Sequence, residues 1–243
     1  TDIDRWIGYI KTPEYLAKGH STRCSYDHEF SVLRGILNFY ASRYNRNYRL
    51  PFIRDHKAML KVREKPATQP KDLLVEEFRK FAISLKEICE EAGCEAIYYM
   101  ALMQYAIYSR GQEAAALHYE DFDFKRGKVI VNKKIQWLRS KHHEDRLVDG
   151  SKKNGGKEIV MSELAASVFR EWVMKSGIRT GLLFRQSDGS FFTYRQIESR
   201  YTQALKKAGL PFSATHILRH ASLTEYYDTC KDLMATAKVA GHS

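Results

Sequence analysis

The chain has 243 residues, of which 44% are hydrophobic and 28% are charged, and its formal net charge is +11. A chain of this composition can bury enough apolar surface to fold, which excludes wholesale disorder. No apolar run approaches the ~20 residues that a membrane span needs, and the first residues lack the basic-then-apolar order of a signal peptide. We therefore expect a cytoplasmic protein that has no membrane partner.

The positive charge is concentrated in two separate blocks. Residues 1–70 hold 13 Lys and Arg against 7 Asp and Glu, a net +6, and residues 125–157 hold 11 against 3, a net +8. The rest of the chain therefore sums to −3. A charge excess that serves only solubility is expected to mix its signs more evenly. This concentration favours a polyanionic partner, and nucleic acid is favoured over a membrane surface.

The first part of the chain reads as a small helical domain with a basic surface. Apolar residues recur there at spacings of three and four, the pattern of an amphipathic helix. They are Phe30, Leu33, Leu37, Tyr40 and Tyr44. Around this helix lie Arg34, Arg43 and Arg46, which we take as DNA-binding residues. The proline-containing stretch Val62–Asp72 predicts a linker, and we place the domain at residues 1–65 and the linker at 66–74.

The remaining residues, 75–243, combine helical patterns with a few strands. A helix is predicted from Val75 to a break at Gly93, and an apolar helix over Ala96–Tyr108. Residues 127–137 and 157–161 are rich in β-branched residues and predict a small antiparallel sheet. Helical patterns return over Glu163–Ser176, Tyr194–Ala208, His216–Asp228 and Lys231–Ala240. The predicted fold is mainly α with a small antiparallel β-sheet.

Nothing in the sequence indicates a cofactor or a bound metal. The four cysteines form no pair with zinc spacing, and they read as free thiols. They are Cys24, Cys89, Cys94 and Cys230. His142 and His143 are adjacent and would point to opposite faces of a strand. Because no glycine-rich phosphate motif occurs either, we expect chemistry without a nucleotide cofactor or metal.

Four short motifs hold the polar residues that could carry chemistry. Arg110 lies three residues before Glu113, lysines enter the turn at 152–153, His216 shares a helix face with Arg219, and Gly241-His242 closes the sequence. Taken alone, the residues of each motif are more often ordinary surface or helix-capping residues.

In combination and in this order, the motifs resemble the catalytic residues of the tyrosine recombinase (phage integrase) family. Its members typically read Gly-Leu-Arg-x-x-Glu and then Leu-x-Trp-x-Asp-hydrophobic-Asp. Here residues 108–113 read Tyr-Ser-Arg-Gly-Gln-Glu, and residues 117–123 read Leu-His-Tyr-Glu-Asp-Phe-Asp. The family's His-x-Leu-Arg-His occurs at 216–220, and its Leu-Gly-His-Ser occurs as Ala-Gly-His-Ser at 240–243. The resemblance implies an α+β integrase-like catalytic domain over 75–243, preceded by a helical core-binding domain.

The resemblance also implies what these residues do when a DNA phosphodiester is cut. Arg110 and Arg219 would donate to the non-bridging oxygens of the pentavalent transition state, for which the planar guanidinium suits better than an ammonium. His216 would hydrogen-bond the phosphate and help manage the nucleophile's proton. His242 would donate to the phosphate or position the nucleophile.

The basic block 125–157 would add contacts from a hairpin. By the family's register Lys153, in preference to Lys152, would protonate the leaving 5′ oxygen. The DNA-binding lysines that we predict in this block are Lys133, Lys134, Lys152 and Lys157.

The family's nucleophile is a tyrosine about two to three helical turns beyond the Gly-His motif, and the sequence stops at Ser243. Tyr226 and Tyr227 precede this motif, so we expect them to be packing residues. As written, residues 1–243 should therefore not cleave DNA in cis. A truncated segment, a tail that the sequence does not include and an inactive paralogue remain open, and the retained phosphate-site residues favour the first two.

We therefore predict a site-specific DNA recombinase, encoded by a phage or mobile element in a bacterial host, that acts through a 3′-phosphotyrosyl intermediate. It would clamp duplex DNA between its two domains and work as a tetramer on DNA, and it would be a monomer in free solution. Three alternatives remain: a type IB topoisomerase, a non-catalytic DNA-binding regulator, and an unrelated helical protein in which these motifs are ordinary residues.

Overall fold

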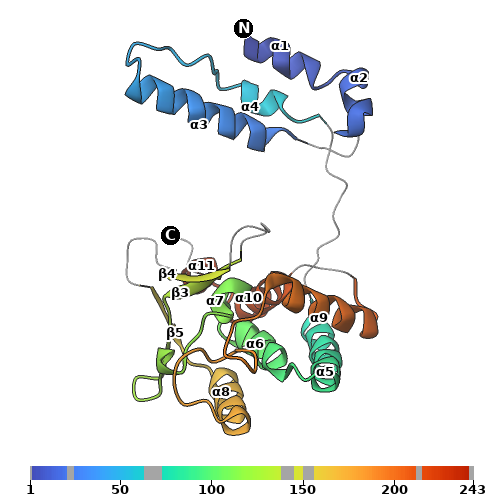
Figure 1. Cartoon of the computed structure of the whole chain (residues 1–243), viewed down its shortest axis with the longest axis vertical. Coiled ribbons are helices and arrows are strands. Elements are labelled where there is room, and N and C mark those ends of the chain that lie inside the picture. The colour runs from blue at the N-terminus through green and yellow to red at the C-terminus, as the bar shows by residue number, and fades with distance from the viewer. Residues whose placement is uncertain are drawn as a thin grey trace. The chain divides into compact units, whose positions relative to one another are not determined.

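The chain forms two compact units, Thr1–Gln69 and Pro70–Ser243. The computed structural model describes residues 2–20, 25–62, 73–137, 145–149, 156–211 and 215–240, and the side chains at 19 and 20 are not described. Each unit has its own cluster of buried apolar side chains. Figure 1 shows the elements of both units.

Within its described residues, the first unit contains helices and an isolated antiparallel bridge between Ser25 and Lys61. Its elements are α1 (Asp2–Tyr9), α2 (Pro13–Tyr15), the π-helix η1 (Leu16–His20), α3 (Asp27–Arg43) and α4 (His56–Met59). Its core is formed by the buried faces of α1 and α3 together with Leu60, which is fully buried. Thr12 caps α2, because its hydroxyl accepts a hydrogen bond from the Tyr15 N–H at 3.3 Å.

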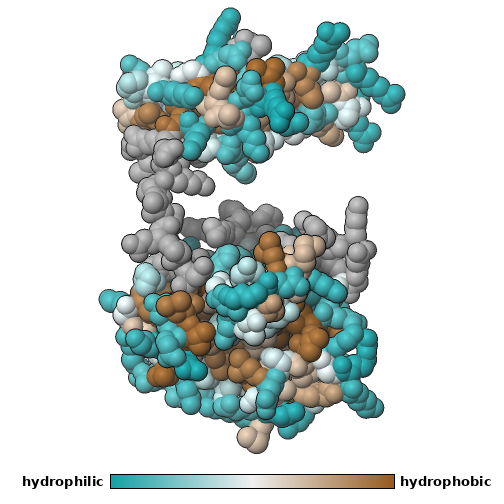
Figure 2. Space-filling model, turned by 180° about the vertical axis from the view of Figure 1, so that it is seen from behind, coloured by the Kyte–Doolittle hydropathy of each residue, from teal (hydrophilic) through white to brown (hydrophobic). Residues whose placement is uncertain are grey.

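The amphipathic helix predicted from the apolar stripe is α3, but only part of the stripe is buried. Phe30 lies in the core, whereas Tyr40 and Tyr44 are exposed, Tyr44 by 74%. Tyr40 stacks on Tyr44 with ring centroids 5.9 Å apart, and it also meets the Tyr48 ring edge-on at 5.3 Å. Exposed apolar side chains appear among polar ones on the surface of this unit in Figure 2. The spacing thus predicted the helix correctly and overstated how much of its stripe is buried.

The second unit is built around one central helix. Its helices are α5 (Val75–Glu91), α6 (Glu95–Ala106), α7 (Gly111–Ala114), the 3₁₀ helix η2 (Tyr119–Asp121), α8 (Glu163–Ser176), α9 (Tyr194–Lys207), α10 (Ile217–Cys230) and α11 (Leu233–Ala240). Most residues of α6 are buried, because α5, α8 and α10 all pack against it. Figure 1 shows α6 between α5 and α8. The apolar composition that predicted this helix therefore reflects burial on every side.

The strands form two small antiparallel sheets. Their bounds are β1 (Phe122–Asp123), β2 (Lys128–Val131), β3 (Lys133–Gln136), β4 (Arg146–Asp149) and β5 (Lys157–Val160). One sheet has the order β1-β2-β5, and the other pairs β3 with β4. The sequence predicted one small sheet from residues 127–137 and 157–161, whereas the structure has two, because the chain passes from one sheet to the other at Asn132. The predicted fold class, mainly α with a small antiparallel β-sheet, is confirmed.

Candidate active site

Arg110 stands where α6 ends and α7 begins. Its backbone N–H donates to Glu113 Oε2 at 2.9 Å, and its guanidinium donates to Glu113 Oε1 at 2.8 Å. The first contact satisfies a free N–H at the start of α7. The Arg110 side chain remains 43% exposed. Glu113 therefore fixes one edge of the guanidinium and leaves the rest open to a ligand.

Arg219 is almost completely buried on α10, with 5% of its surface exposed. Its guanidinium donates to the Tyr108 carbonyl at 2.7 Å and to the Ala240 carbonyl at 2.5 Å. This side chain thus joins three segments: the end of α6, the start of α10 and the end of α11. The Ala240 carbonyl immediately precedes the Gly241-His242 motif, so Arg219 anchors the residue from which that motif continues.

Tyr108 occupies the position where the family typically has glycine, and its backbone is left-handed, with φ 55°. A bulky residue adopts this conformation only at a cost. Its ring packs edge-on against Tyr226 with centroids 5.3 Å apart, in agreement with the packing role predicted for Tyr226. The departure from the family pattern at Tyr108 therefore keeps the glycine-like backbone turn that precedes Arg110.

The charges of this region act on one another. Burial lowers the pKa of Arg219, and the positive charge of Arg110 lowers it further, against the opposing effect of Glu113. Partial burial, His220 and then the two arginines lower the pKa of His216, so its imidazole is neutral at pH 7. Burial acts to raise the pKa of Glu113, but the hydrogen bonds from Arg110 and the charge of Lys157 hold it below its usual value.

The structure therefore brings together Arg110, Arg219 and His216, which the sequence had assigned to one site, although more than a hundred residues separate the first two. Two planar guanidiniums and a neutral imidazole beside a single carboxylate form a cationic site for an anion such as a phosphodiester. Lys153 and His242, assigned to the same site, lie outside the described residues, as does Lys152.

Lys157, predicted as a DNA-binding residue, lies in the same cluster. Its ammonium is buried, and Glu113, Arg219 and Arg110 are the charges that act on it. The local sequence gave no sign of this burial. The signal that could have found it is the place of Lys157 at the start of β5. This strand pairs with β2, and β2 leads directly to β3, which packs on α7.

The other predicted DNA-binding residues are distributed over both units. Lys133 forms an ion pair with the buried Asp121, with Nζ and Oδ1 2.6 Å apart. Lys134 is half-buried on the same strand. Arg34, Arg43 and Arg46 are exposed in the first unit, along α3 and just after it. Their DNA-binding role stays a prediction.

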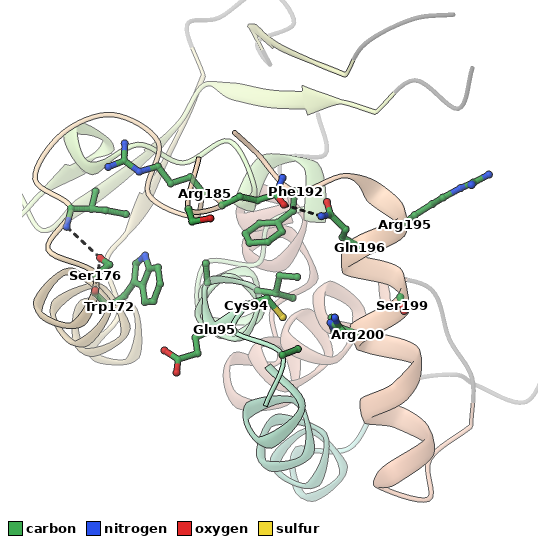
Figure 3. Close-up of a pocket in the computed structure, with 17 residues that line it drawn as sticks. Cys94, Glu95, Trp172, Ser176, Arg185, Phe192, Arg195, Gln196, Ser199 and Arg200 are labelled. Atoms are coloured by element: carbon green, nitrogen blue, oxygen red, sulfur yellow. Dashed lines mark hydrogen bonds between the residues drawn. The ribbon is translucent and has the colours of Figure 1, made fainter. Parts of the chain in front are cut away.

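A separate cavity of about 920 Å³ lies between the start of α6, the end of α8 and the start of α9. Figure 3 shows Trp172 and Phe192 beside it, with Arg195 pointing away from it. Glu95, on its lining, is paired with Lys175 at 2.7 Å. Among the described residues that line it, none belongs to the predicted catalytic set.

Two further findings concern the described part of the chain. No group of three or more His, Cys, Asp or Glu residues is placed there to hold a metal ion. No helix there has the length and apolar character needed to span a membrane. Of the cysteines that are described, Cys89, Cys94 and Cys230 are free thiols.

Comparison with known proteins identifies the family. Residues 80–243 match the model of the phage integrase family, which covers more than half of the chain, and the chain therefore belongs to this family of tyrosine recombinases. A curated relative is the virulence plasmid integrase pGP8-D of Chlamydia muridarum (strain MoPn / Nigg), which is 28% identical over 136 residues. That match covers 55% of this chain and 36% of the relative, so the chain matches little more than a third of the relative's length.

Solved structures show the same fold. The Tn1549 transposon integrase in complex with circular intermediate DNA has a TM-score of 0.70 at 20% identity, over 100% of this chain and 77% of that one. The XerH site-specific recombinase bound to a palindromic difH substrate has a TM-score of 0.60 at 21% identity, and the match covers 89% of this chain and 60% of XerH. A λ integrase tetramer bound to a Holliday junction has a TM-score of 0.53 at 13% identity, and the match covers 88% of this chain and 56% of the λ integrase chain.

Proposed function

We propose that this chain is part of a site-specific DNA recombinase that breaks and rejoins DNA through a 3′-phosphotyrosyl intermediate. The observation that carries the proposal is that Arg110, Arg219 and His216 lie close enough for the charge of Arg110 to lower the pKa values of the other two. The family assignment and the DNA-bound integrases of the same fold support it.

In the proposed mechanism the scissile phosphate lies against the two guanidiniums. Arg110 uses the N–H groups that Glu113 leaves free, and Arg219 uses those not bound to backbone carbonyls. Both stabilise the charge that accumulates on the non-bridging oxygens as the fifth bond to phosphorus forms. His216, neutral at pH 7, can both accept and donate a proton beside this charge.

Three further parts of the mechanism follow the family pattern. We propose that Lys153 protonates the leaving 5′ oxygen and that His242 contacts the phosphate or positions the nucleophile. In the family order the nucleophilic tyrosine follows the Gly-His motif, and no tyrosine up to Ser243 lies in that order. Cleavage is assayed on the full-length gene product.

Binding of duplex DNA should weaken steeply with salt. We propose that both basic blocks contact the DNA, with contacts from Arg34, Arg43, Arg46, Lys134 and the hairpin lysines. If these neutralise about six phosphates or more, the association constant falls by about a thousandfold between about 50 and 200 mM salt. Fluorescence anisotropy of a labelled duplex measures this slope. A flat salt dependence would contradict binding through the two basic blocks.

We propose that the subunits assemble as a tetramer only on DNA and are monomers in free solution. Light scattering of the full-length gene product should then give the monomer mass without DNA and four subunits per complex with a synapsed pair of sites. A stable tetramer without DNA would contradict this proposal, and the λ integrase complex on a Holliday junction gives the precedent for four subunits on DNA.

A further inference from the structure

The ammonium of Lys157 is buried, and no hydrogen-bond partner for it lies among the described residues. Two other lysines of the sheets are paired: Lys128 with Glu158 and Lys133 with Asp121. Because an unpaired buried charge costs free energy, an ammonium kept in such a place points to a ligand, an ordered water or a functional role.

The backbone fixes the position of Lys157. It pairs with Val131 at the end of the β2–β5 ladder. The preceding Gly156 has φ +99°, and a Cβ there would lie 2.6 Å from the Asn132 Cβ and 3.1 Å from the Asn132 Cα. Only glycine fits this approach of the two strands. The start of β5 is therefore held against the residue at which the chain passes to β3, which fixes the backbone position of Lys157.

The charges around Lys157 come from two other helical segments. Glu113 of α7 is the carboxylate that stabilises the ammonium, whereas Arg219 of α10 and Arg110, before α7, repel it. Glu113 is already bound by the Arg110 guanidinium and N–H. On the β3 side, Lys133 is neutralised by Asp121. Among the described residues, the cluster thus holds three cations and one shared carboxylate, an imbalance that a bound phosphate would correct.

We propose that Lys157 is a phosphate-contacting lysine of the active site, additional to the hairpin residue Lys153, and that the cluster of Arg110, Arg219 and Lys157 binds its phosphate only when Lys157 is protonated. The proposal rests on the proposed function, since it takes the arginine site to be a phosphate site. It also gives Lys157 a direct contact with the scissile phosphate in place of a contact with the flanking DNA backbone.

The protonation state of Lys157 changes near physiological pH. Burial, opposed by Glu113 and aided by Arg219 and Arg110, lowers the pKa of Lys157 to about 8. An anion beside the ammonium favours the charged form and raises this pKa again, so binding above pH 8 takes up a proton. Below pH 8 the lysine is already protonated and binding is independent of its titration. His216, whose pKa is lowered, stays neutral throughout the alkaline range.

Sulfate is a suitable probe, because it stays dianionic across this range. Its affinity for residues 1–243 is measured from the methyl resonance of Ala114, which lies next to Glu113 in α7, at constant ionic strength. We expect Lys157→Met to weaken sulfate binding about tenfold at pH 7, since a charge-assisted contact is lost. Lys157→Arg should retain most of the affinity. Lys128→Met, which removes a paired lysine of the same sheet, should leave it unchanged.

The pH profile separates a phosphate contact from a structural role. Wild-type affinity should fall by up to tenfold per pH unit above about pH 8, and Lys157→Arg should remain flat to about pH 9.5, because a guanidinium stays charged. Lys157→Met should melt at the same or a higher temperature than the wild type, since it removes an unpaired buried charge. Unchanged sulfate affinity in a folded Lys157→Met protein, or a wild-type profile that is flat above pH 8, would overturn the inference.

Arg110→Ala distinguishes failure of this inference from failure of the proposed function. If Arg110→Ala weakens sulfate binding and Lys157→Met does not, the phosphate site stands and Lys157 has no part in it. If neither substitution changes sulfate binding, the cluster is not a phosphate site, and the proposed function loses the observation that carries it.

Discussion

Replacing Arg110 with alanine is expected to reduce cleavage of a nicked suicide substrate by the full-length gene product about a thousandfold. The guanidinium is held by Glu113 yet remains 43% exposed, so it can reach a phosphate without rearrangement. Its planar fork matches two phosphate oxygens, and its loss removes stabilisation that is made mainly in the transition state. Covalent protein–DNA complex formation in single-turnover reactions measures the effect.

Two comparisons make this result specific. Arg110→Lys keeps the charge and loses the fork, so its cleavage rate should fall between those of the wild type and the alanine variant. Arg79→Ala removes an exposed arginine that is paired with Glu76 on α5, and it should leave cleavage unchanged. Duplex affinity of Arg110→Ala should stay within about threefold, because many other phosphate contacts remain. Cleavage at the wild-type rate would exclude Arg110 from the active site.

The helices of the second unit could be read from the sequence because their ends are marked locally. The helix predicted over Glu163–Ser176 is α8 with the same bounds. Ser162 caps its start, where the hydroxyl accepts from the Ala165 N–H at 3.1 Å, and Gly177 ends it with φ 70°. Periodicity, an N-cap and a glycine C-cap here agree with one another, and this agreement makes a boundary predictable.

The sheets were predicted less well because their pairing is not local. Asn132 separates β2 from β3, and only the partners of these strands, β5 and β4, show that they belong to different sheets. The strand β4 was not predicted, since most of its residues are exposed and it shows no alternation of apolar and polar positions. A short polar strand is specified by its partner more than by its own sequence.

The residues of the candidate active site also divide into those that local sequence predicts and those that depend on distant segments. Arg110, Arg219 and His216 could be assigned from motif order, because each motif is a short continuous segment. The role of Lys157 could not, since its burial depends on α7 and α10, which are distant in sequence. The strain at Tyr108 was also hidden, because the residue type opposes the conformation that the structure requires.

Replacing Arg219 with alanine is expected to lower both the cleavage rate and the stability of the second unit, unlike the change at Arg110. Its side chain satisfies the Tyr108 and Ala240 carbonyls, and the substitution leaves both without this donor, the first partly buried and the second buried. We expect a loss of about 2 kcal/mol of unfolding free energy, partly offset by relief of repulsion with Arg110. The partly exposed Arg110 should cost less than about 1 kcal/mol when it is replaced.

Urea unfolding of residues 1–243 measures this difference through tryptophan emission. A Trp6→Phe background, common to all variants, removes the tryptophan of the first unit, so that Trp137 and Trp172 report on the second. Arg219→Lys should recover little stability, because one ammonium cannot span two carbonyls as the guanidinium does. If Arg219→Ala were as stable as Arg110→Ala, the hydrogen bonds from Arg219 to the Tyr108 and Ala240 carbonyls would contribute nothing to the unfolding free energy. The hydrogen bond from Arg219 to Ala240 lies one residue before Gly241-His242. Its loss should therefore also displace this motif. Cleavage by Arg219→Ala should then fall further than the loss of one phosphate contact explains.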